Sequence, residues 1–183
     1  MTLTLEVARA ALRRLTADQA TPPAWSDDDL DTALAIGLAQ LDQLAPFAAV
    51  VRLAAGGTDR LPLPSGVQRV LAVLCAGQPL AGWSVWAGEL VFAEPVSGSL
   101  ELRCWQRRTL PAAASDPLPL SGPAEETFLL AAAGEALLVQ ALARQGRHQG
   151  PVGPLVAALE QARAQRERAA RSLPRVLCSW SLR

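Results

Sequence analysis

The sequence predicts an α+β fold, a bundle of about four helices that carries an inserted small antiparallel β-sheet and ends in an extended C-terminal arm. Leucines and alanines recur at helical spacing near both ends of the chain, whereas residues 47–111 alternate between apolar and polar. Runs rich in proline and glycine separate these segments. With 183 residues, half of them hydrophobic, the chain is long enough to bury a core. We therefore expect a single domain over residues 1–172 and a separate segment over 173–183.

Two helices are predicted before the sheet, over residues 3–18 and 26–45. Pro22 and Pro23 separate them, because proline cannot continue a helix. Ser26 with Asp29 three residues later resembles a capping box, a typical helix start. Each helix has one apolar stripe, formed by Leu5, Ala8, Leu12 and Leu15 in the first and by Leu30, Leu34, Leu38 and Leu41 in the second.

The predicted β insertion over residues 47–111 consists of four or five short antiparallel strands joined by tight turns. Gly56-Gly57, Gly77, Ala87-Gly88 and the stretch "VSGS" at 96–99 are the turn signals. In "SLELRCWQRR", Leu100, Leu102 and Cys104 alternate with Glu101, Arg103 and Trp105. This alternation is typical of a sheet with one face more buried than the other.

Two more helices are predicted after a proline-rich loop at 110–123. The helix over 123–145 is almost continuously apolar and should be central, with Phe128, Leu130, Leu137 and Leu138 holding the protein together. The helix over 152–172 begins apolar and becomes rich in arginine. Pro174 follows it.

The charge of the chain is balanced but unevenly distributed. Residues 1–46 contain three arginines and seven acidic residues, whereas residues 144–183 contain eight arginines and two acidic residues. Such polarity can help copies of one protein to meet head to tail. No apolar run reaches the roughly 18 residues that a membrane span requires, and the N-terminus lacks the order of a secretory signal. We therefore expect no membrane association and synthesis in the cytoplasm.

Few residues favour catalysis. His148, the one histidine, lies in a loop rich in glycine and proline, and nothing around Cys104 indicates an activated thiol. The three cysteines are far apart and have no CxxC spacing, so we interpret them as core or interface residues. The run "SDDDLD" lacks the spacing of a calcium loop, and helix capping explains it. We expect no cofactor and no metal.

Nucleotide and nucleic-acid binding are also weakly supported. The glycines do not form a P-loop or a dinucleotide-binding motif. The arginines of "RAQRERAARS" are interleaved with Glu167, which favours a solvated or subunit-contacting face over a nucleic-acid site. Trp83, Trp86 and Trp105 are interpreted as core or interface anchors. By elimination, the residues favour a protein whose work is assembly.

The order of these segments resembles the head-tail connector (adaptor) proteins of tailed bacteriophages. The likeness covers most of residues 26–172. It rests on "SDDDLDTALAIGLAQLDQL", "RLPLPSGVQRVLAVLCAGQPL", "WSVWAGELVFAEPVSGSLELRCWQRRTLP", "EETFLLAAAGEALLVQALA" and "QARAQRERAARSL". The β region is larger than in a minimal connector, and it keeps a tail-completion or tail-terminator protein as the alternative. A small cytoplasmic binding domain or a thiol-dependent enzyme is the alternative from another class.

The resemblance implies a structural protein of the virion neck that is not an enzyme. Copies would form a ring, dodecameric in that family, on the portal protein, extend the DNA channel, and provide the docking surface for the next neck or tail protein. Packaged DNA would pass through the lumen without sequence-specific binding. A closed ring needs two different complementary faces on each copy. We expect these inter-subunit charge contacts from Asp27, Asp28, Asp31, Arg163, Arg166, Arg168 and Arg171.

The segment "LPRVLCSWSLR" at 173–183 alternates in a strand-like manner directly after a charged helix. One interpretation is that it packs on its own sheet. We instead expect an arm that docks on the portal or on a neighbouring subunit by adding a strand to an exposed sheet edge. Its predicted partner-binding residues are Arg175, Val176, Leu177, Cys178, Trp180 and Leu182.

Overall fold

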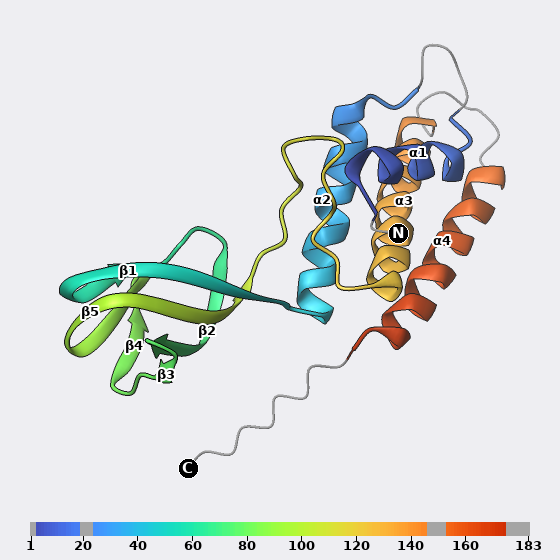
Figure 1. The fold of residues 1–183 in the computed structure, drawn as a ribbon. Helices are drawn as coiled ribbons and strands as arrows, with labels where there is room; N and C mark the ends of the chain where they lie inside the picture. Colours follow the sequence, from blue (N-terminus) through green and yellow to red (C-terminus); the bar gives the residue numbers. More distant parts are fainter. Residues whose placement is uncertain (1–2, 19–23, 146–152, 175–183) are drawn as a thin grey trace. The chain divides into compact units, whose positions relative to one another are not determined.

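The computed structural model describes residues 3–18, 24–145 and 153–174, and the chain divides into two compact units. Met1–Ala45 and Arg108–Arg183 form the helical unit, and Pro46–Arg107 forms the β unit. The described residues form four helices and a five-stranded antiparallel sheet (Figure 1). The predicted α+β class, with a sheet inserted between helices, is therefore confirmed. The extended arm in the prediction, residues 175–183, lies outside the described residues.

The helices begin and end where local signals allow. Their bounds are α1 Leu5–Leu15, α2 Asp27–Leu44, α3 Pro123–Gln145 and α4 Gly153–Ser172. The hydroxyl of Thr4 caps α1 by accepting from the backbone N–H of Val7. The hydroxyl of Ser26 accepts from the N–H of Asp29, whose carboxylate accepts from the N–H of Ser26. This reciprocal capping box confirms the predicted start of α2.

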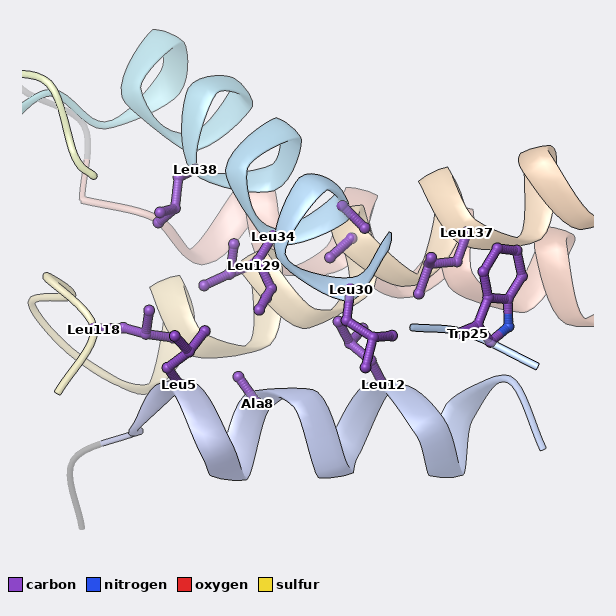
Figure 2. Close-up of a cluster of buried hydrophobic side chains, with 12 residues drawn as sticks. Leu5, Ala8, Leu12, Trp25, Leu30, Leu34, Leu38, Leu118, Leu129 and Leu137 are labelled. Atoms are coloured by element: carbon purple, nitrogen blue, oxygen red, sulfur yellow. The ribbon is translucent and has the colours of Figure 1, made fainter. Parts of the chain in front are cut away.

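Leucines from three helices form the main core of the helical unit. Figure 2 shows Leu5, Ala8 and Leu12 of α1 pointing toward Leu30 and Leu34 of α2. Leu129 and Leu137 of α3 complete the cluster. Each fully buried leucine contributes about 1.5–3 kcal/mol relative to an exposed one. The apolar stripes predicted for the first two helices are buried as expected, apart from Leu15, which is only partly buried.

Two glycines let α3 approach its neighbours closely. A Cβ atom at Gly37 of α2 would lie 2.8 Å from Cδ1 and 3.2 Å from the carbonyl oxygen of Leu129. A Cβ atom at Gly134 of α3 would lie 2.7 Å from Cδ2 of Leu15 in α1. Both distances are too short for a side chain, so α3 packs through glycine against α1 and α2.

Helix α3 is also long and apolar enough, by length and composition, to cross a membrane. The sequence interpretation had found no run of that length. In the structure α3 contacts α1, α2 and α4, and Phe128, Leu137 and Leu138 are buried between them. The core helix of a globular unit has the same length and composition, and the position of α3 is that of a core helix.

The sheet of the β unit is built on one long central strand. The strands are β1 Phe47–Pro62, β2 Val67–Cys75, β3 Gln78–Pro79, β4 Trp83–Trp86 and β5 Glu89–Gln106. Their order is β1-β5-β2-β3, and β4 also pairs with β5. All the pairings are antiparallel. Strand β5 therefore has β1 along one side, with β2 and β4 along different parts of the other.

Two of the predicted turns were wrong. Gly56-Gly57 lies inside β1, which continues to Pro62. The stretch "VSGS" at 96–99 lies inside β5, so the two strands predicted on either side of it are one long strand. Gly56 pairs with Ser97, and the register shifts between Gly56 and Thr58. Gly57 and Gly98 have positive φ angles of 81° and 108°. The glycines allow irregularities in two paired strands instead of reversing the chain.

The β unit has a smaller core than the helical unit. Leu100 and Leu102 of β5 are fully buried, as their alternation predicted. They pair with Leu53 and Val51 of β1, which are only partly buried. The inner face of the sheet is therefore well covered over the central strand and less covered over β1.

Candidate assembly surfaces

The predicted assembly residues belong to the start of α2, to α4 and to the segment 173–183. The first two groups are described by the structure. The predicted arm residues Arg175, Val176, Leu177, Cys178, Trp180 and Leu182 lie outside the described residues, as does His148. Leu173 is buried against Ala169 of α4, and Pro174 is the last described residue.

Most of the acidic cluster at the start of α2 is paired with α1. Arg9 donates from Nε and Nη2 to the two carboxylate oxygens of Asp31, at 2.8 and 2.7 Å. Its Nη1 is 3.2 Å from Asp27, and Arg13 contacts the other oxygen of Asp27 at 2.7 Å. The hydrogen bond to Asp31 is the largest reason that the pKa of Arg9 is raised. The two arginines thus neutralise Asp27 and Asp31 within the same chain.

Asp18 is an acidic residue whose buried carboxylate accepts hydrogen bonds from the backbone just before α2. Its side chain is 2% exposed and accepts from the backbone N–H groups of Ala24 and Trp25 at 2.8 and 3.1 Å. Arg13 lies 3.2 Å from the same carboxylate. Burial alone would raise the pKa of Asp18, but the two N–H groups and Arg13 favour the charged form. The pKa is therefore lowered overall.

Asp29 joins the start of α2 to the end of α3. Its capping bond from the Ser26 hydroxyl is the largest cause that lowers its pKa. Arg144 lies 3.4 Å from Asp29, and its guanidinium carbon lies 4.7 Å from the ring centre of Trp25. The sequence interpretation had not singled out Arg144. Its position in the last turn of an apolar helix gave no signal of either partner.

The arginines of α4 divide into paired and exposed residues. Arg163 and Arg166 both contact Glu135 of α3, at 3.0 and 2.8 Å. Arg168 is exposed and donates to the backbone oxygen of Ala164 within the same helix. Arg171 is exposed in the last turn of α4. Arg163 and Arg166 therefore stabilise the α3–α4 pair, and Arg168 and Arg171 point outward.

The predicted contact residues that remain outward lie at opposite ends of the helical unit. Asp28 is exposed at the start of α2 and forms no ion pair with another described residue. The far end of α2, at Leu41, packs against Ala169 near the end of α4. A helix of 18 residues is about 27 Å long. Asp28 is thus about one helix length from Arg168 and Arg171. Figure 1 shows the start of α2 apart from the end of α4.

A buried charged cluster, which the sequence interpretation missed, lies at the exit from the β unit. Arg108 contacts Asp42 of α2 at 2.6 Å and Glu125 of α3 at 3.0 Å. It also donates to the carbonyl oxygens of Ala45 and Pro119, at 2.7 and 2.9 Å. All three charged side chains are at most 5% exposed. Ala45 and Arg108 are the residues of the helical unit next to the insertion, so this cluster holds the two crossing points together.

The outer face of the sheet carries arginine and tryptophan side chains. Arg69 of β2 lies over the ring of Trp105 in β5, with 5.2 Å between the guanidinium carbon and the ring centre. Trp86 is 72% exposed at the β4–β5 hairpin. These tryptophans were predicted to be anchors of a core or an interface. The exposure of Trp86 fits an interface better than a core.

The thiols of the described residues are not arranged for nucleophilic chemistry. Cys104 is 1% exposed, and burial raises the pKa of its thiol. Its sulfur lies 3.7 Å from the carbonyl oxygen of Ala49 on the paired strand. Cys75 is partly buried and lies near the carbonyl oxygen of Ser97. Among the described residues no group of three or more potential metal ligands is found.

An open groove with a volume of about 660 Å³ lies between α3 and α4 of the helical unit. Its lining is small and mostly uncharged. The lining residues are Pro123, Ala124, Thr127, Gln165, Arg168, Ala169 and Ser172. The groove places Arg168 beside apolar surface and is suited to contact with another protein more than to a small reactive substrate.

Comparison with known proteins gives no relative for this chain: no family model matches it, and no curated protein is similar enough to match. Inferences about its function therefore rest on the residues and on the geometry described above.

Proposed function

We propose that the protein is a head-to-tail adaptor of a tailed bacteriophage. It is made in the host cytoplasm and becomes part of the virion neck, at the junction of portal and tail. There it forms a ring on the portal protein, dodecameric as in the family it resembles. The ring extends the DNA channel and provides the docking surface for the next neck or tail protein. DNA passes through the lumen without sequence-specific contacts.

The observation that carries this proposal is the order of the elements. An acidic-capped helix, an inserted antiparallel sheet, an alanine- and leucine-rich core helix and an arginine-rich helix follow one another, as in the connectors that the sequence resembles. The insertion begins directly after α2, and its two crossing points are held by Arg108. An anchored insertion of this kind suits a protein that presents a sheet to its neighbours from a stable helical base.

The distribution of exposed charge supports a ring. Asp28 lies at one end of the helical unit, and Arg168 and Arg171 lie at the other. A ring requires a heterologous interface, in which one surface of a copy meets a different surface of the next copy. Opposite charges on two separate ends favour that arrangement over a two-fold dimer, in which each surface would meet itself. Asp27, Asp31, Arg163 and Arg166 have partners in their own chain and contribute less.

The chemistry of the described residues favours assembly over the thiol-enzyme alternative. A nucleophilic cysteine needs a lowered pKa and access to substrate. Cys104 has a raised pKa and is buried beneath the sheet. The open groove and the exposed Trp86 are features that fit contact with other proteins.

Charge reversal tests the proposed interface. The double substitution Arg168→Glu and Arg171→Glu should convert the assembled species into monomers, as measured by sedimentation velocity with and without the portal protein. Adding Asp28→Arg should restore at least part of the assembly, because the reversed charges attract again. Arg163→Ala is the matched control, since Arg163 is paired with Glu135 in its own chain.

The location of the protein in the virion tests the function itself. Labelling in particles should place it at the neck, between portal and tail. A position on the head-proximal end of tails that have not yet joined a head would favour the tail-completion or tail-terminator alternative. A monomer that never joins particles would contradict both structural functions.

A further inference from the structure

Strand β1 leaves one edge of the sheet without a partner among the described strands. It pairs with β5 along one side, and it is the first strand in the order β1-β5-β2-β3. Residues 48–55 of this edge contain one charged residue, Arg52, and no proline. The register shifts begin only at Gly56. Natural sheets usually protect an open edge with charge, proline or bulges, so an apolar edge of this length indicates a site for strand addition.

The side chains of β1 show which face of the sheet is incompletely buried at this edge. Val51 and Leu53 point to the inner face with Leu102 and Leu100, their partners in β5. The two β5 leucines are fully buried, whereas Val51 and Leu53 remain partly exposed. An added strand that places apolar side chains on this face would extend the inner layer by one row.

The chain contains a segment with the required pattern. Residues 175–183 follow the last described residue, and Val176, Cys178, Trp180 and Leu182 alternate with Leu177, Ser179 and Ser181. Nine residues in an extended strand span roughly 30 Å, which is the length of the open part of β1. One face of such a strand would be apolar throughout, and the other would carry two serines.

We propose that residues 175–183 of one copy add as a strand to the β1 edge of a second copy, with Val176, Cys178, Trp180 and Leu182 on the inner face. This inference rests on the proposed ring and names the surface that receives the arm. Each copy has one such arm and one β1 edge, so a closed ring of such exchanges covers every β1 edge. An arm used on the portal would leave each β1 edge exposed, which is why a second copy is the occupant we favour.

Disulfide trapping tests the pairing and its orientation. Two forms are mixed: an isotopically labelled acceptor that carries Val51→Cys with Cys178→Ser, and an unlabelled donor that retains Cys178. Mild oxidation should link residue 51 of the acceptor to Cys178 of the donor, as identified by mass spectrometry. Leu53→Cys is a second acceptor on the same face, in case one substitution impairs the sheet.

Val50→Cys is the control for orientation. Val50 directly precedes the first acceptor position, residue 51, but lies on the opposite face, and it is 59% exposed. Random collision would favour this more accessible position. The proposal instead expects at least tenfold less linkage at residue 50 than at residue 51, because the paired strand holds Cys178 on the other face.

The possible outcomes separate this inference from the proposed function. Equal linkage at residues 50 and 51, no linkage to Cys178, or linkage only within one copy would overturn the inference. Rings that join portal and tail without the 51–178 linkage would leave the adaptor function standing and reject the β1 edge as the receiver. Linked copies that never form rings would support strand exchange and count against the adaptor function.

Discussion

The helical unit and the β unit bury their interiors in different ways. In the helical unit, leucines from three helices meet in a closed core, and Arg108 with Asp42 and Glu125 forms a satisfied polar cluster inside it. In the β unit, one face of a single sheet supplies most of the core, and β1 leaves that core partly open along its edge. Among the described residues, the helical unit therefore closes its own core, whereas the β1 edge of the sheet has no paired strand.

The largest expected effect is the loss of unfolding free energy when the buried Arg108 is replaced. Replacing Arg108 with Met leaves Asp42 and Glu125 without their cation at positions that are at most 5% exposed. Removing one partner of a buried charge cluster costs about 3–5 kcal/mol of unfolding free energy. Chemical denaturation should show that loss in the helical unit. The control, Arg144→Ala, removes an exposed pair and should cost less than about 1 kcal/mol; equal losses in the two variants would contradict this account.

Acid should weaken the helical unit through Asp18. Its pKa is lowered in the folded protein, so its contribution is complete above the unfolded value and is lost as the pH falls through the folded value. Asp18→Asn should therefore be less stable than the natural protein at pH 7, and the difference should narrow as the pH falls below about 4. Thermal unfolding of both proteins from pH 7 to pH 2 measures this difference in stability. Asp59→Asn, at an exposed position in the β unit, should leave the unfolding of the helical unit unchanged.

The smallest expected effect is a gain of stability in the β unit. Ala87 has a φ angle of 50° and Gly88 one of 80°, so the two-residue loop between Trp86 and Glu89 has positive φ at both positions. Alanine is strained there, and asparagine is favoured. Ala87→Asn should raise the unfolding free energy of the β unit by about 0.5–1 kcal/mol. The matched Ala54→Asn, on a strand, should lower it; a gain at both positions would show that backbone strain is not the cause.

The sequence predicted the helices well because their signals are local. The Ser26–Asp29 capping box marked the start of α2, and the leucine stripe of that helix is buried as expected. The sheet was predicted less accurately. Glycines at 56–57 and at 98 are as typical of turns as of bulges, and only the pairing of β1 with β5 distinguishes the two.

The candidate site was predicted unevenly for the same reason. The sequence indicated charged groups at both ends of the helical unit, but it contained no sign of which were already paired. Arg9 and Arg13 lie on a different helix from Asp27 and Asp31, and Glu135 is separated from Arg163 by a whole loop. The partners of long charged side chains depend on packing between helices, which periodicity does not specify.

The sequence by itself determined the α+β class, the helix starts and the apolar faces, because capping, periodicity and proline act over a few residues. Three features were visible only in the tertiary structure: Arg108 is buried at the two crossing points, Asp28, Arg168 and Arg171 remain outward, and β1 has no partner on one side among the described strands. These features arise from contacts between residues far apart in the chain, and such contacts form only when the helices and strands have packed.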